Sequence, residues 1–141
     1  MKISTFGAAI LSAGLLFTPA LADDHEGGDP EKGKKVFKKC AACHAIGEGA
    51  KLKVGPPLNA IFGRVAGSYE GMKYGKHLVE AGEAGLVWTP EEMFAYLENP
   101  KKYLRSRLDN KKAKSKMAFK LKKKKDRRNL IAFLATLGVT E

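Results

Sequence analysis

The apolar positions after residue 28 follow the spacing of an amphipathic helix. Small or apolar residues recur on one side, and lysines occupy most of the remaining positions. The members of this stripe are Gly33, Val36, Phe37 and Cys40. Just before it, Asp29-Pro30-Glu31 supplies an N-cap, a proline at the first helical position and an acidic residue in the first turn. We therefore predict a helix from Pro30 into the region of Cys40.

A second apolar stripe lies near the C-terminus, in the segment 126–137. Its members recur at spacings of three and four residues, and they are Leu130, Phe133, Leu134 and Leu137. Gly138 follows at the position expected for a helix C-cap. The two helices need partners for their stripes, so we predict that they cross. Gly33 would allow a close approach, with Phe37 and Phe133 flanking the crossing.

The middle of the chain is rich in loops. Six glycines and prolines between residues 47 and 63 indicate turns, with room for only a short helical piece around 58–62. Thr89-Pro90-Glu91-Glu92 begins another helix, which Asn99-Pro100 ends. We find no internal repeat and no strand pattern. The predicted fold class is therefore all-α with long loops.

The first 22 residues have the form of a secretory signal peptide. Lys2 precedes an apolar segment from Ile3 to Phe17, and Ala20-Leu21-Ala22 matches the small-x-small pattern of a signal-peptidase site. An uncleaved membrane anchor is the alternative, which the polar residues and the proline in this stretch disfavour. We predict cleavage after Ala22, a flexible acidic leader over 23–28 and one domain over 29–141, in a protein exported to a bacterial periplasm.

Charge adds a preference for acidic partners. Removal of the 22-residue signal peptide from the 141 residues would leave 119, a small domain with few apolar residues for a core. The chain holds 26 Lys and Arg against 15 Asp and Glu; the signal takes away only Lys2, so the balance of the remainder is +10. Such an excess favours acidic partners met by electrostatic steering. Nucleic acid, the usual alternative, is not an expected partner in the periplasm.

The residues Cys40-Ala41-Ala42-Cys43-His44 form the attachment sequence of a covalent c-type haem. On a helix they share one face, so both thiols can reach the vinyl groups at one haem edge while His44 faces the iron. A zinc site would need four ligands, but the chain has two cysteines, and His25 and His77 lack partners at ligand spacing. A redox dithiol would need a preceding strand, and none is predicted. A buried haem would also enlarge the small core.

These features together resemble class I cytochrome c, and within it the larger bacterial members called cytochrome c2 or c-550. The resemblance covers nearly the whole chain after residue 28, and it rests on the order and spacing of its motifs. Besides Gly33, Phe37 and the haem sequence, these motifs are Val54-Gly55-Pro56-Pro57-Leu58, Phe62-Gly63-Arg64, Tyr74, Trp88, Tyr96-Leu97-Glu98-Asn99-Pro100-Lys101-Lys102-Tyr103, Lys116-Met117-Ala118-Phe119 and Leu130-Ile131-Ala132-Phe133-Leu134. The resemblance implies a small, loop-rich cytochrome c fold whose helices wrap around one haem.

Two departures from the family pattern concern loops. Pro57 stands where the family often has Asn, and the segments 75–87 and 104–115 are longer than in mitochondrial relatives. An insertion before the axial methionine is common in the c2 and c-550 group. The longer segments therefore favour that group.

The resemblance implies His44 and Met117 as the two iron ligands. It also implies that the carbonyl of Pro56 accepts a hydrogen bond from the His44 ring and so fixes its tautomer. Met93 and Met72 are the rivals for the sixth position, but Met93 lies on the apolar face of a helix and Met72 in a glycine-rich loop. A thioether ligand favours ferrous iron and raises the reduction potential.

Further site residues follow from the resemblance alone. Arg64, Tyr74 and Trp88 are expected to donate to the haem propionates, Ser115 to add a hydroxyl, and Tyr96 to lie on the Met117 side of the haem. For Tyr74 and Trp88, ordinary core packing is the alternative. The lysines expected around the exposed haem edge are Lys39, Lys53, Lys101, Lys102 and Lys116. For any one of these lysines, a merely solvated role is the alternative.

Six-coordinate iron has no open position for a substrate, so the resemblance implies a one-electron carrier and not an enzyme. We expect a monomer that shuttles electrons from a cytochrome bc1 complex to a reaction centre or terminal oxidase, in photosynthesis or respiration, with transient contact at the membrane surface. One alternative is a peroxidase-like haem enzyme or gas sensor with a labile sixth ligand. Another is a binder of polyanions or lipid headgroups that uses residues 120–128.

Overall fold

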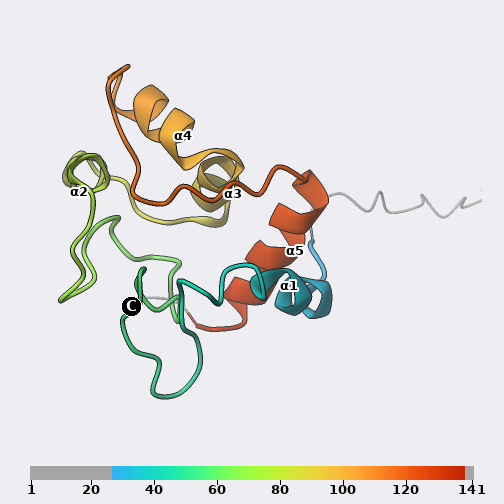
Figure 1. Cartoon of the computed structure of the whole chain (residues 1–141). Coiled ribbons are helices and arrows are strands. Elements are labelled where there is room, and N and C mark those ends of the chain that lie inside the picture. The colour runs from blue at the N-terminus through green and yellow to red at the C-terminus, as the bar shows by residue number, and fades with distance from the viewer. Residues whose placement is uncertain (1–26, 139–141) are drawn as a thin grey trace, which may run out of the picture.

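The computed structural model describes residues 27–138, and this part of the chain contains five helices. Figure 1 shows their arrangement. They are α1 (Pro30–Phe37), α2 (Lys76–Glu83), α3 (Pro90–Glu98), α4 (Pro100–Arg107) and α5 (Lys124–Ala135). No strand runs through this range, and an isolated antiparallel bridge joins Val65 to Val87. The all-α class with long loops is therefore confirmed. The predicted signal peptide, its cleavage site and His25 lie outside the described residues.

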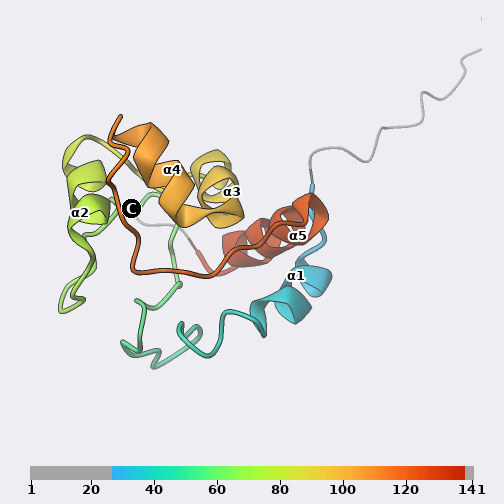
Figure 2. The same ribbon diagram turned by 45° about the horizontal axis from the view of Figure 1, so that its top comes forward.

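Helices α1 and α5 pack against each other at one end of the molecule, while α2, α3 and α4 lie together at the other end (Figures 1 and 2). Long loops connect the two groups. None of the helices between residues 27 and 138 has the length and apolarity needed to cross a bilayer.

The α1/α5 contact is a close approach of backbone to backbone. A Cβ atom on Gly33 would lie 1.9 Å from the carbonyl oxygen of Asn129 and 2.6 Å from the Cβ of Phe133. The rings of Phe37 and Phe133 lie beside it with their centroids 5.8 Å apart. In addition, the Asn129 side chain accepts a hydrogen bond from the backbone N–H of Asp29, the N-cap of α1. The predicted crossing is confirmed.

The ends of these two helices differ slightly from the prediction. Helix α1 ends at Phe37, and the chain continues in tight turns through Cys43. Helix α5 covers 124–135, whereas the prediction was 126–137. Gly138, with φ +89°, stands in the left-handed region beyond the helix end. Gly28, expected in a flexible leader, already packs on α5, because a Cβ there would lie 2.0 Å from the Arg128 carbonyl oxygen.

The middle of the chain contains more helix than its sequence predicts. Helix α3 begins at its Thr89 cap as expected, but Asn99-Pro100 also begins α4, whose first turn is capped by the Asn99 side chain. Helix α2 has a glycine at its N-cap and no capping side chain, so local signals were weak. The short helical piece for which the sequence left room around 58–62 does not form; Asn59 and Ala60 lie in a turn. Packing explains the extra helices: Leu104 of α4 and Ala81 of α2 are fully buried.

We predict that Gly33→Ala will destabilise the protein, because the new methyl group would meet the Asn129 backbone of α5. The free energy of unfolding should fall by about 1–3 kcal/mol or more, the usual cost of overpacking. Denaturant unfolding of the haem-containing protein measures this. Gly27→Ala is the matched control, since nothing lies within 4 Å of a Cβ at that position. Equal stabilities of the two variants would contradict the close crossing.

Candidate functional site

The segment from Cys40 to His44 forms one helical turn after the end of α1. The backbone N–H groups of Cys43 and His44 both donate to the carbonyl oxygen of Cys40, at 3.0 and 2.9 Å. Positions 40, 43 and 44 therefore face the same side, as their spacing predicts. Burial raises the pKa of the Cys40 thiol to about 11, which is the opposite of an activated redox thiolate.

This turn forms part of the wall of a cavity of about 980 Å³. The cavity lies between the loops and α3, and Leu130 and Leu134 of α5 also line it. Most of the predicted site residues reach it: Cys40, Cys43, His44, Pro56, Tyr74, Trp88, Tyr96, Ser115 and Met117. Residues far apart in the sequence thus surround one large, mainly apolar space.

The His44 ring is held in a defined orientation. Its Nδ1 lies 2.8 Å from the carbonyl oxygen of Pro56, the contact that the sequence analysis anticipates. If Nδ1 donates to this carbonyl, the lone pair of Nε2 is free for a metal. Burial lowers the pKa of His44, against the opposing effect of the Pro56 hydrogen bond, and so favours the neutral ring that binds metals.

The loop that carries Pro56 is fastened to the haem-attachment turn. The N–H of Gly55 donates to the Cys43 carbonyl at 2.8 Å, and that of Leu58 donates to the Ala45 carbonyl at 3.0 Å. A Cβ on Gly55 would lie 2.3 Å from Cε1 of His44. The imidazole therefore rests directly against the Gly55 backbone, and only glycine leaves it this space.

Three methionines line the cavity: Met72, Met93 and Met117. Met93 belongs to the buried apolar core on α3, and Met72 to the loop before α2. Met117 lies in the irregular segment between α4 and α5, where the Ser115 hydroxyl donates to its carbonyl oxygen at 2.9 Å. Lining the cavity does not by itself distinguish the three as ligands.

The predicted propionate donors behave differently from one another. Tyr74 and Trp88 line the cavity, but Arg64 does not. The Arg64 guanidinium instead donates to the carbonyl oxygens of Pro57 at 2.9 Å and Asn59 at 2.6 Å. Arg64 therefore holds the loop that follows Pro56, a role that became visible only once the loop's path was known.

Behind Trp88 lies an aromatic row that the sequence analysis missed. The Trp88 and Tyr96 rings meet edge to face with centroids 4.8 Å apart, and Tyr96 meets Tyr103 at 5.5 Å. The Tyr103 hydroxyl donates to Glu92 at 2.5 Å, and Arg107 pairs with the same carboxylate at 2.6 Å. Burial and the Glu92 hydrogen bond raise the pKa of Tyr103. The row ties the cavity wall to α4, a helix that was not predicted.

Lysines and exposed apolar side chains meet at the cavity. Of the five predicted lysines, Lys39, Lys53 and Lys116 line it, whereas Lys101 and Lys102 in the first turn of α4 do not. Lys73 and Lys114 line it as well and were missed. We call the five lining lysines the lysine rim: Lys39, Lys53, Lys73, Lys114 and Lys116. Val54, 75% exposed, Leu52 and Phe119 are exposed apolar residues in the same lining.

Comparison with known proteins places this geometry in a family. The cytochrome c family model matches residues 30–138. The chain belongs to the cytochrome c family. It is 45% identical over 115 residues to cytochrome c2 iso-2 of Rhodospirillum centenum, covering 77% of this chain and 95% of that protein. It is 48% identical over 105 residues to cytochrome c2 of Afifella marina, covering 74% and 78% respectively.

Solved structures agree with this membership. Cytochrome c2 from Rhodospirillum centenum superimposes with a TM-score of 0.76 at 44% identity, covering 79% of this chain and 99% of that one. Ferric cytochrome c-550 from Paracoccus versutus gives a TM-score of 0.70 at 37% identity, covering 77% and 97%. The predicted resemblance to cytochrome c2 and c-550 and the cytochrome c fold are thus confirmed.

The protein accordingly carries a covalently attached haem c and is an electron carrier of the cytochrome c2 type. The residues fit this group. Two cysteines and a histidine occupy one turn, the histidine ring is braced by Gly55 and Pro56, and the space beyond it is large and mainly apolar. The zinc and dithiol interpretations of Cys40 and Cys43 are thereby excluded.

We predict that Gly55→Ala will displace the His44 ring, because the new Cβ would overlap Cε1. The unfolding free energy of the haem protein should fall by about 1–3 kcal/mol or more, as for other overpacked sites, and its absorption spectrum should change. Gly75→Ala is the matched control in the same cavity lining, since its nearest neighbour is the flexible Lys116 side chain at 3.2 Å. Identical spectra for both variants would contradict the bracing role of Gly55.

Proposed function

We propose that this cytochrome is a monomeric periplasmic shuttle that carries single electrons from a cytochrome bc1 complex to a reaction centre or terminal oxidase. The observation that supports it most is the site itself. A haem-attachment turn and a methionine segment line one cavity, whose lining also includes exposed apolar residues and lysines. Relatives named cytochrome c2 support the same class of carrier. Export with cleavage after Ala22 belongs to this proposal, as does the domain over 29–141.

In this proposal His44 and Met117 would be the two protein ligands of the haem iron. His44 has one nitrogen free for a metal because its other nitrogen contacts the Pro56 carbonyl. Met93 is part of the helical core, which disfavours it as the ligand. Met72, like Met117, lies on an irregular segment, and between these two the resemblance to cytochrome c2 favours Met117. Haem supplies the redox-active iron, and a thioether ligand favours its ferrous state.

The chain's own residues would tune that state. The cavity lining is mainly apolar, and a medium of low dielectric constant penalises the extra positive charge of the ferric form. Tyr74 and Trp88 are the proposed donors to the propionates, and Tyr96 lies beside them in the lining. Ser115 could join them only if its hydroxyl gave up the hydrogen bond to the Met117 carbonyl. Arg64 would act indirectly, by holding the loop from Pro57 to Asn59.

Electron exchange would take place where the haem edge is exposed at the cavity mouth. Val54, Leu52 and Phe119 could supply the apolar contact with a partner, and the lysine rim the attraction to its acidic face. With both His44 and Met117 bound to it, the iron would offer no open site for a substrate. A peroxidase-like enzyme or gas sensor would need a labile sixth ligand, so ligand lability separates the two functions.

Replacing Met117 by Ala tests the ligand assignment. The reduction potential should fall by on the order of 100 mV, because the ligand that favours ferrous iron is lost, and cyanide should bind rapidly to the opened position. Potentiometry and cyanide binding measure this. Met93→Ala is the control and should keep the wild-type spectrum, including the weak red band of methionine-ligated ferric haem. The reverse pattern would assign the ligand to Met93.

The lysine rim can be tested by reversing charges with the net change held constant. Lys73→Glu with Lys114→Glu should lower the rate of electron transfer with a purified bc1 complex, oxidase or reaction centre by about tenfold or more, because charges steer association. The salt dependence of this rate should also become flatter, because salt screens exposed charges beyond about 8 Å at physiological ionic strength. Lys123→Glu with Lys124→Glu, on exposed positions away from the cavity, is the control.

Two further results decide the extent of this docking face. Slower transfer after Lys101→Glu with Lys102→Glu would extend the face to α4. Equal losses from all three pairs would mean that net charge alone attracts the partner. A wild-type protein that none of these complexes oxidises or reduces at a useful rate would contradict the shuttle itself.

A further inference from the structure

The segment that carries Met117 has no regular secondary structure of its own. Residues 110–123 lie between α4 and α5, outside any helix or strand. Buried backbone groups in such a segment must find partners elsewhere in the protein. The residues that supply those partners therefore determine where Met117 lies.

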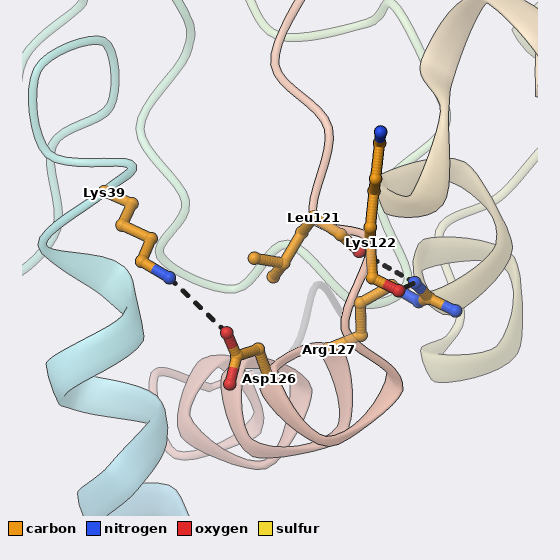
Figure 3. Close-up of polar contacts among 5 residues, drawn as sticks. All are labelled: Lys39, Leu121, Lys122, Asp126 and Arg127. Carbon is orange, nitrogen blue, oxygen red and sulfur yellow. Dashed lines mark hydrogen bonds and ion pairs between the residues drawn. The ribbon is translucent and has the colours of Figure 1, made fainter.

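Arg127 supplies the partners on the C-terminal side. Its Nη1 donates to the carbonyl oxygens of two successive residues, Leu121 at 2.7 Å and Lys122 at 2.8 Å, and Figure 3 shows the guanidinium reaching from α5 to this stretch. The N–H of Leu121 donates to the Leu97 carbonyl of α3 at 2.8 Å. These contacts fix the backbone four residues after Met117.

A second arginine acts on the N-terminal side. Nε of Arg105, in α4, donates to the carbonyl oxygen of Ala113 at 3.1 Å, and Ala113 is fully buried. Ala113 and Leu121 each lie four residues from Met117. An arginine therefore holds the backbone on each side of the proposed ligand, at equal distance along the chain.

The burial of Arg127 requires an explanation beyond packing. Its side chain is 1% exposed, lies over the Phe94 ring at 4.4 Å and has its Nη2 3.6 Å from the carboxylate of Glu98, which is itself largely exposed. Burying a charge costs free energy, and an apolar residue of similar volume often gives equal or better stability. An apolar side chain, however, could not donate to two adjacent carbonyl groups, which Nη1 of Arg127 does.

The neighbouring residue shows that this is specific to position 127. Asp126 points away from Arg127, and its carboxylate lies 3.4 Å from the ammonium group of Lys39, which follows α1 (Figure 3). Arg128, which follows on the same helix, is exposed. Among the described residues, Arg127 is the one of these three consecutive charged residues whose side chain donates to the segment that carries Met117.

We propose that Arg127, together with Arg105, is a positioning residue that holds Met117 on the haem iron and so limits how readily this ligand is displaced. The inference rests on the proposed assignment of Met117 as the ligand. Loss of either arginine would release one end of the segment and raise the population in which the thioether is away from the iron. The iron would then be open to external ligands for a larger fraction of the time.

The test compares Arg127→Met with Arg128→Met in the haem-containing protein. Both variants lose one positive charge, but only the first loses the two backbone hydrogen bonds. We expect Arg127→Met to bind cyanide about tenfold faster than wild type or more, which corresponds to ~1.4 kcal/mol in the opening equilibrium. On heating, its red methionine-to-iron band should disappear before its far-ultraviolet helical signal. Arg127→Lys, which keeps the positive charge on a shorter side chain without the planar guanidinium, should be intermediate.

A merely structural role would give a different result. Arg127→Met would then lose the red band and the helical signal together at a lower temperature, with wild-type cyanide binding at 25 °C, and this outcome would overturn the proposal. If Arg127→Met yields no folded haem protein, Arg105→Met is the deciding variant, with the same expected increase. Wild-type behaviour of Arg105→Met would then overturn it.

The Met117→Ala variant separates failure of this inference from failure of the ligand assignment. If Met117→Ala binds cyanide rapidly while Arg127→Met behaves like Arg128→Met, the ligand is correct and the positioning role is wrong. If Met117→Ala keeps the red band, the ligand assignment itself is wrong and the inference falls with it.

Discussion

The close contact between α1 and α5 determines where both sides of the haem site stand. Gly33 lets the two backbones meet, and the Asn129 side chain holds the start of α1 on α5. The far end of α1 leads directly into the Cys40 turn, and Lys39 pairs there with Asp126 of α5 (Figure 3). Helix α5 in turn contributes Leu130 and Leu134 to the cavity and Arg127 to the methionine segment. One crossing therefore relates the histidine side to the methionine side.

The two sides are built by different means. On the histidine side, the loop over 54–58 is attached to the haem-binding turn through backbone hydrogen bonds and the Pro56 contact with His44. On the methionine side, the backbone of an irregular segment is held by a backbone hydrogen bond, from Leu121 to Leu97, and otherwise mainly by arginine side chains from α4 and α5. Side-chain anchors of this kind have more conformational freedom than backbone pairing. This difference provides a physical reason for the methionine to be the more easily displaced ligand in the proposed arrangement.

Sequence patterns predicted much of the fold where the signal is local. The caps at Asp29 and Thr89 and the stripes through Phe37 and Phe133 predicted α1, α3 and α5, because capping and periodicity act within a few residues of the chain. Helices α2 and α4 were missed. Helix α2 has no capping side chain, and Asn99-Pro100 predicted only the end of the preceding helix although the same two residues also begin α4. Burial of Ala81 and Leu104 against other elements stabilises the two helices.

The sequence by itself determined the cofactor, since two cysteines and a histidine within five residues already define covalent haem attachment. It also gave a choice of three methionines and a list of lysines, without their positions. Only the tertiary structure decided that Lys73 and Lys114 belong to the lysine rim while Lys101 and Lys102 do not. It also decided that the guanidinium groups of Arg64 and Arg127 donate to backbone carbonyls. Such roles depend on where loops far apart in sequence come together, and long-range packing, not local pattern, decides that.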